Sequence, residues 1–308
     1  MAFGTQEIKQ LREMTGAGMM DCKKALTETN GDIEAAATYL REKGIAKAQK
    51  KSGRIAAEGL VQVKMRGNDA ASLVEVNSET DFVAKNDEFV QFVDELAQLA
   101  LEREAKSAEE LKEADFGGKT AQEALNEKIA KIGENMTLRR ADYVTGDAVF
   151  SYVHGNGRIA SVVALESNAE ASELEQLGKD ISMQVASMNP KYISTDDVDQ
   201  DYIASEKEVL LNQALNENKE LEAQGKAKPV EIVEKMVMGR LNKELKEVCL
   251  LEQPFIKDSA ITVGKLVDEK AKELGKDIKV SQIVRYEVGE GLEKKEENFA
   301  EEVAKQMA

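Results

Sequence analysis

The feature that most constrains the fold is a pattern that occurs twice: two alternating segments around a short turn, followed by an amphipathic helix. In the first copy, residues 59–64 and 72–76 alternate apolar and polar side chains, which is typical of a β-hairpin. The second copy covers residues 149–154 and 159–165, with Gly155-Asn156-Gly157 as its turn. The helices that follow carry apolar side chains at helical spacing, namely Phe89, Phe92, Val93, Leu96 and Leu99, then Leu174, Leu177, Ile181, Val185 and Met188. Two such units predict a duplicated α+β core, with each antiparallel sheet covered by helix.

A helical region precedes this core. The first ~45 residues predict three short helices, with Thr5 and Asp32 as N-caps and Gly16 and Gly18 as breakers. Their expected inward side chains are Ile8, Leu11, Met14, Cys22, Ala25, Leu26, Ile33, Ala36, Ala37 and Leu40. Lys47, Lys50, Lys51 and Arg54 follow without apolar periodicity, which predicts an exposed basic linker.

The remaining segments predict mostly helix. Residues 121–138 predict a helix that links the two units, and residues 199–246 predict an antiparallel helical hairpin that projects from the body. The hairpin's apolar stripes are Ile203, Val209, Leu210, Ala214 and Leu221, facing Val230, Ile232, Val233, Val237, Leu241 and Leu245. A strand over residues 283–289 and a polar helix with Phe299 and Val303 end the chain.

Composition narrows the function. A formal net charge of -16 repels phosphate backbones, so we expect no direct nucleic-acid partner. No run of ~18 apolar residues occurs, so we expect no membrane segment. Cys22 and Cys249 are far apart in the chain, which is typical of free thiols in a reducing compartment. With an N-terminus that lacks the features of a signal or transit peptide, these observations predict a cytoplasmic protein.

The residues offer little to a catalytic hypothesis. The chain has one histidine, His154, and neither cysteine lies beside an activating motif. Residues 117–120, GGKT, imitate the end of a phosphate-binding loop, but Glu113 stands where that loop needs glycine. We therefore expect a protein that is not an enzyme and that uses no cofactor or metal.

Several residues have both a structural and a contact interpretation. In residues 80–86, TDFVAKN, the pattern alone favours a helix cap by Thr80 or Asp81 with Phe82 packed beneath the helix. Met19 flanks an inward helix face and Met20 lies outside it, so a contact patch and chance exposure are equally compatible. His154, at a strand end, is typical of a hydrogen-bonded structural residue, and Met236 and Val237 are typical of hairpin core.

Longer strings resemble one family. Residues 11–26, LREMTGAGMMDCKKAL, and residues 80–86 resemble two signatures of the elongation factor Ts family. Further similarities follow in family order, namely KIGEN at 131–135 with Arg139-Arg140, SYVH at 151–154, EKMV at 234–237 with Gly239-Arg240, and QPF at 253–255. The resemblance covers essentially the whole chain. The segments 102–115 and 217–227 are longer than in shorter members of the family.

The resemblance implies a fold and a domain division. It implies an α+β, multidomain chain with a ubiquitin-associated-like three-helix module and linker at residues 1–55 and a core N-subdomain at 56–145. A core C-subdomain would comprise 146–198 and 247–290, interrupted by the inserted hairpin at 199–246, with a C-terminal helix module at 291–308.

The resemblance also implies a guanine-nucleotide exchange factor. Such a factor binds elongation factor Tu-GDP, promotes GDP release and allows GTP to rebind. The implied contact residues for elongation factor Tu are Arg12, Met19, Met20, Thr80, Asp81, Phe82, Val83, His154, Met236 and Val237, with Asp81 and Phe82 entering the GTPase domain near its magnesium site. Homodimerisation and a heterotetramer with elongation factor Tu both stay open. Two other classes also stay open: a ubiquitin-associated-like adaptor, and an acidic helical chaperone that uses the hairpin as a clamp.

Overall fold

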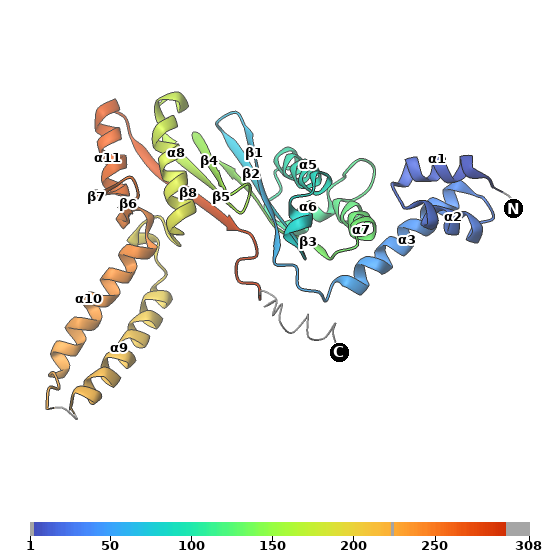
Figure 1. Cartoon of the computed structure of the whole chain (residues 1–308). Coiled ribbons are helices and arrows are strands. Elements are labelled where there is room, and N and C mark those ends of the chain that lie inside the picture. The colour runs from blue at the N-terminus through green and yellow to red at the C-terminus, as the bar shows by residue number, and fades with distance from the viewer. Residues whose placement is uncertain (1–2, 223–224, 294–308) are drawn as a thin grey trace.

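The computed structural model describes residues 3–222 and 225–293 and has an α+β, multidomain architecture. A three-helix module lies at one end, two sheet-and-helix units form the middle, and a helical hairpin projects from the other end (Figure 1). The predicted C-terminal helix with Phe299 and Val303 falls outside the described residues.

The N-terminal module has its own small core. Its helices are α1 (Thr5–Thr15), α2 (Met19–Glu28) and α3 (Ile33–Lys51). Leu11, Cys22, Ala25, Leu26 and Ala36 are buried between them, as the spacing predicts. Gly4, rather than Thr5, occupies the N-cap of α1. Met14 is exposed, because the inward face of α1 ends at Leu11 and the chain turns at Gly16.

The predicted basic linker is helical as far as Lys51, and only residues 52–57 connect α3 to β1. Helix α3 continues to Lys51 and packs against a helix of the first unit, with Ala48 buried in that unit's core. The Lys51 ammonium donates to the carbonyl of Gly133, and Lys47 pairs with Asp21 at 3.2 Å. Only small side chains face inward here, so helical packing leaves little apolar signal in the sequence.

The first unit is a three-stranded antiparallel sheet covered by helices. Its strands β1 (Glu58–Arg66), β2 (Ala70–Ser78) and β3 (Met136–Thr145) lie in the order β1-β2-β3. The helices are α4 (Asp81–Ala84), α5 (Asp87–Arg103), α6 (Ala108–Glu113) and α7 (Ala121–Ile132). The predicted helix over 121–138 therefore ends at Ile132, and Met136 to Leu138 begin β3 instead.

The second unit repeats this plan. Its strands β4 (Ala148–His154), β5 (Ile159–Ser167) and β8 (Ile278–Glu287) lie in the order β4-β5-β8, covered by α8 (Ala171–Met188) and α11 (Val263–Leu274). The final strand thus begins before the predicted residue 283. Met188, predicted inward, is exposed at the end of α8. Between α8 and α11 lie the hairpin, a two-stranded ribbon of β6 (Pro254–Phe255) and β7 (Asp258–Thr262), and two 3-10 turns at Thr195–Asp197 and Leu250–Glu252.

The two units match in detail. The third residue of each central strand, Ser72 and Ser161, donates its hydroxyl to a carbonyl of the covering helix, at 2.7 and 2.6 Å. Both central strands shift register between their sixth and seventh residues. The α7–β3 and α11–β8 segments have equal lengths, begin at a threonine N-cap and turn at a glycine. The two units therefore share one plan, element by element.

The two sheets pack face to face. Apolar side chains from both form a shared core that includes Val61, Leu73, Val162 and Tyr286. The Tyr286 hydroxyl donates to Asp142 Oδ2 at 2.5 Å, and burial raises the pKa of the Asp142 carboxyl. The body is therefore a stack of helices, sheet, sheet and helices, which Figure 1 shows edge-on.

The helical hairpin consists of α9 (Gln200–Glu222) and α10 (Val230–Val248). Ala214, Val233 and Val237 form its small buried cluster, with Leu210, Leu211 and Leu215 packed around them. Three predicted inward residues, Val209, Val230 and Ile232, are exposed instead. The two-helix contact buries only a narrow stripe, which is why part of the apolar pattern stays outside it.

Candidate partner-binding surface

The TDFV turn, residues 80–83, projects from the first unit just after β2. Thr80 has an extended backbone and caps the four-residue helix α4, while Asn86 caps the long helix α5. Phe82 has 81% of its surface exposed. The expectation that Phe82 packs beneath the helix is therefore wrong, because Val83 occupies the buried position.

The neighbours of Phe82 fix the turn on both sides. Val83 is buried in the core of the first unit, so it supports the turn. Thr80 is partly buried and makes two hydrogen bonds to Glu134. Among residues 80–83, Val83 packs in the core and Thr80 caps α4, whereas Asp81 and Phe82 carry the accessible groups. The contacts of all four residues with a partner stay a prediction.

Asp81 presents a charged group beside the exposed ring. Its Oδ2 lies 2.5 Å from the Lys85 ammonium. The hydrogen bond from Lys85 is the main cause that lowers the pKa of the Asp81 carboxyl. Asp81 is therefore ionised at neutral pH, and the turn offers an aromatic ring together with a carboxylate.

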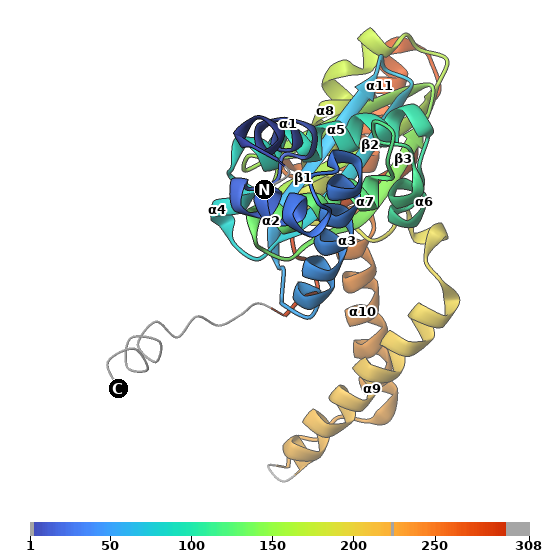
Figure 2. The same ribbon diagram turned by 90° about the vertical axis from the view of Figure 1, so that its right-hand side faces the viewer.

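A second exposed group lies on the N-terminal module. Met19 and Met20 begin α2 and are 61% and 75% exposed, and Arg12 is exposed near the end of α1. Gly16, with a left-handed backbone, makes the turn that brings the end of α1 to the start of α2. Both methionines are thus available to a partner. In Figure 2, α1, α2 and α4 lie toward the same side of the body.

A cleft of about 620 Å³ lies between the N-terminal module and helices α5 and α7, beside the contact of α3 with α7. Eight lysine and arginine side chains line it, against four carboxylates. Some are paired across the first unit, with Lys128 and Lys131 at 2.7 and 2.8 Å from Glu88. This face therefore offers local positive charge on a chain whose formal net charge is -16.

His154 lies exposed at the end of β4. Its Nδ1 is 3.0 Å from the Tyr152 hydroxyl, on the same strand. The turn after it packs on the first unit, since the Val61 amide donates to the Gly157 carbonyl at 2.8 Å. A Cβ at Gly157 would lie 2.3 Å from Leu60 Cδ1, so glycine permits this close approach. The packed turn holds the histidine at the surface.

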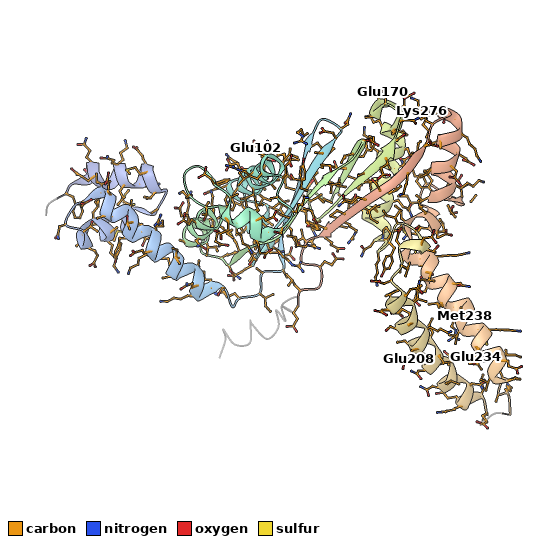
Figure 3. The ribbon with its side chains drawn as sticks, turned by 180° about the vertical axis from the view of Figure 1, so that it is seen from behind. Glu102, Glu170, Glu208, Glu234, Met238 and Lys276 are labelled. Atoms are coloured by element: carbon orange, nitrogen blue, oxygen red, sulfur yellow. The ribbon has the colours of Figure 1, made fainter. Side chains whose placement is uncertain are left out.

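Met236 and Val237, the two expected contact residues on the helical hairpin, differ in burial. Val237 is buried between α9 and α10, where it packs in the hairpin's apolar cluster, and its contact with a partner stays a prediction. Met236 is partly buried, with its sulfur 3.3 Å from the Lys228 ammonium. The exposed methionine of this helix is Met238, which Figure 3 shows on the same helix as Glu234.

Within residues 3–222 and 225–293, no group of three or more His, Cys, Asp or Glu side chains is placed to hold a metal ion. In the same ranges, no helix has the length and apolar character to cross a membrane.

Comparisons with known proteins agree with the geometry. A sequence model of the family described as elongation factor TS matches residues 79–290. A protein of Clostridioides difficile (strain 630) named elongation factor Ts is 57% identical over 305 residues, covering 98% of each chain. One of Clostridium botulinum (strain Alaska E43 / Type E3) with the same name is 53% identical over 309 residues, covering 99% of each.

These similarities place the chain among translation elongation factors. With more than two thirds of its residues matched by the family model and its relatives covered from end to end, the chain belongs to the elongation factor Ts family.

One site residue escaped the sequence reasoning. Glu134 lies in the KIGEN string, which carried the resemblance without a stated role. Its partner, Thr80, is 54 positions away. The register of β2 against β3 would have placed Glu134 opposite Thr80. The sequence analysis could not use this register, because residues 136–138 were predicted as helix and not as the start of β3.

Proposed function

We propose that this chain is a guanine-nucleotide exchange factor that binds elongation factor Tu-GDP and promotes GDP release, allowing GTP to rebind. One observation carries the proposal: Phe82, a large apolar ring, is 81% exposed on a turn that is fixed at Thr80 and Val83. Such exposure is unfavourable in the free protein unless a partner covers the ring. Asp81 beside it supplies a negative charge where a GTPase holds magnesium and phosphates.

The proposed mechanism requires no covalent step in this chain. The ring of Phe82 and the carboxylate of Asp81 enter the GTPase domain and favour a conformation that binds nucleotide weakly. Linkage makes the antagonism reciprocal. The bound exchange factor lowers the affinity of the GTPase for GDP by a certain ratio, and bound GDP lowers the affinity of the GTPase for the exchange factor by the same ratio. The protein therefore acts as a binding protein and not as an enzyme, in the cytoplasm, where its GTPase partner works.

The other exposed residues would supply affinity and orientation. Met19 and Met20 offer adaptable apolar contacts beside Arg12 and the basic cleft, and His154 offers a further contact on the second unit. Because the module and the second unit lie on opposite sides of the first unit, a partner that reaches all three must be large (Figure 1). A multidomain GTPase has the required extent.

Titration calorimetry tests the reciprocity. The affinity of the factor for nucleotide-free elongation factor Tu is measured without and with saturating GDP, and the affinity of GDP is measured without and with the factor. We expect both to fall by one common factor, and we expect Asp81→Ala/Phe82→Ala to reduce that factor while leaving binding detectable. Binding that GDP leaves unchanged would refute an exchange role and leave only an adaptor or chaperone.

A further inference from the structure

Beyond β2 and β3, side chains continue the pairing that the strands begin. The last ladder pair is Ser78 with Met136, so the next residues in register are Glu79 with Asn135, then Thr80 with Glu134. Both pairs are joined. The Asn135 amide donates to Glu79 Oε1 at 2.6 Å, and Glu134 binds Thr80. Carboxylates thus take the place of backbone acceptors where the strands separate.

The bond from Glu134 to Thr80 is bidentate. The Thr80 amide donates to Glu134 Oε2 at 3.0 Å, and the Thr80 hydroxyl donates to Oε1 at 2.8 Å. The Thr80 carbonyl accepts from the buried Ser78 hydroxyl at 3.0 Å. Charge-assisted bonds with two points of contact fix orientation as well as position. Thr80 is therefore held at the residue where the exposed turn begins.

The second unit provides an internal comparison, because its corner has the same register. Its last ladder pair is Ser167 with Ile278, and the Asp277 amide donates to Asn168 Oδ1 at 3.3 Å, in the place of Asn135 and Glu79. The next pair is Ala169 with Lys276, which replaces Thr80 with Glu134. Lys276 instead pairs with Glu173 at 2.6 Å. Glu170 and Lys276 mark this corner in Figure 3.

The difference coincides with the turn that carries Phe82. Eight residues, 79–86, join β2 to α5, whereas three residues, 168–170, join β5 to α8. A corner of this fold therefore closes without the Thr–Glu bond. That bond occurs in the unit whose connection is longer and bears the exposed ring.

We propose that Glu134 is a positioning residue for exchange, which fixes Thr80 so that the turn presents Phe82 to the GTPase in one orientation. The inference rests on the proposed function and deepens it. With Val83 buried and Thr80 held, Phe82 has little backbone freedom, so the ring arrives ordered and less entropy is lost on binding. Without Glu134, the ring remains present but its backbone is released at one end.

The test uses the full chain with Glu134→Ala, Glu134→Gln, Phe82→Ala and the double variant Glu134→Ala/Phe82→Ala. We expect Glu134→Ala to lower kcat/KM for GDP release by about tenfold, and Glu134→Gln, which keeps two hydrogen bonds to Thr80, to stay within about threefold of the wild type. In the Phe82→Ala background, Glu134→Ala should have less than about a twofold effect, since it acts through the ring. Lys276→Ala, at the matching position of the second unit, is the control and should leave release unchanged.

Amide hydrogen exchange of the free factor separates this inference from the proposed function. Glu134→Ala should speed exchange over residues 80–83 and leave α5 protected, whether or not the chain acts on a GTPase. An equal loss of activity from Glu134→Ala with and without Phe82 would overturn the proposal and indicate a direct contact or a general loss of stability. Unchanged hydrogen exchange over residues 80–83 would also overturn it. A wild-type chain that fails to release GDP refutes the exchange function alone.

Discussion

Phe82 and Phe89 provide a matched pair of aromatic residues seven positions apart, one exposed and one buried. Phe82 leaves about one fifth of its surface covered, and full burial of such a side chain stabilises by about 1.5–3 kcal/mol, so Phe82→Ala should cost about 0.3–0.6 kcal/mol. Phe89 is 0% exposed in the core of the first unit, and Phe89→Ala should cost about 3–5 kcal/mol. The corresponding falls in Tm are about 1–2 °C and at least about 6 °C.

Exchange activity should show the opposite order, with the larger loss in Phe82→Ala and the smaller loss in Phe89→Ala. We expect Phe82→Ala, and more strongly Asp81→Ala/Phe82→Ala, to lower kcat/KM for GDP release by about tenfold or more. The folded fraction of Phe89→Ala should retain its activity at low temperature, because its turn is intact. Thermal unfolding and stopped-flow release of a fluorescent GDP are measured on the same preparation. If Phe82→Ala lowers Tm as much as Phe89→Ala does and leaves release unchanged, the ring is a packing residue and our reasoning is refuted.

Deleting residues 1–31 should slow GDP release without changing the Tm of the core. Deleting residues 1–50 should also lower that Tm, because it removes the buried Ala48. Equal Tm values for the two deletions would contradict the packing of α3 on the first unit. His154→Ala should raise KM for release at unchanged Tm, since the ring is exposed; a lower Tm with normal KM would indicate a structural role. Burial raises the pKa of Asp142 in the folded protein, so the stability that this shift contributes is present below the ordinary pKa of 3.8 and is lost as pH rises through the raised value. Urea unfolding should therefore show that Asp142→Asn gains stability relative to the wild type as pH rises over that range. A pH-independent difference between the two proteins would contradict this prediction.

Strongly periodic segments were predictable because each pattern is decided locally. The predicted inward side chains of α5 are all buried, namely Phe89, Phe92, Val93, Leu96 and Leu99. Both β-hairpins turn at their glycine-containing loops. Helical spacing and strand alternation each place one face inward, and both units follow that rule. The antiparallel hairpin of α9 and α10 was found for the same reason.

The missed elements depend on distant partners. The strand β3 contains Arg139 and Arg140, whose guanidinium groups bind the fully buried Glu75 at 3.2 and 2.5 Å. Two adjacent arginines argue locally against a partly buried strand, and their partners, Glu75 and the carbonyl groups of Glu287 and Glu290, all lie in distant segments. The continuation of α3 likewise depends on the surface of α7, which a window over residues 47–54 does not contain.

The residues of the partner-binding surface were also predictable only where local spacing decides their position. The exposure of Met20 was foreseen from helical spacing, whereas the position of Phe82 was not. An aromatic residue after a cap residue is compatible with packing under the helix, and here Val83 takes that place. The choice between adjacent residues depends on the direction in which Thr80 is held, and that direction comes from Glu134, on another strand connection.

Release of labelled GDP from preloaded elongation factor Tu measures exchange directly, with unlabelled GTP in excess and this chain at a substoichiometric amount. We predict complete release at a rate proportional to the amount of this chain, so that each copy acts on many GTPase molecules. We predict a much smaller rate with Asp81→Ala/Phe82→Ala. Release that stops after one equivalent of factor, or that proceeds at the spontaneous rate, would contradict these predictions.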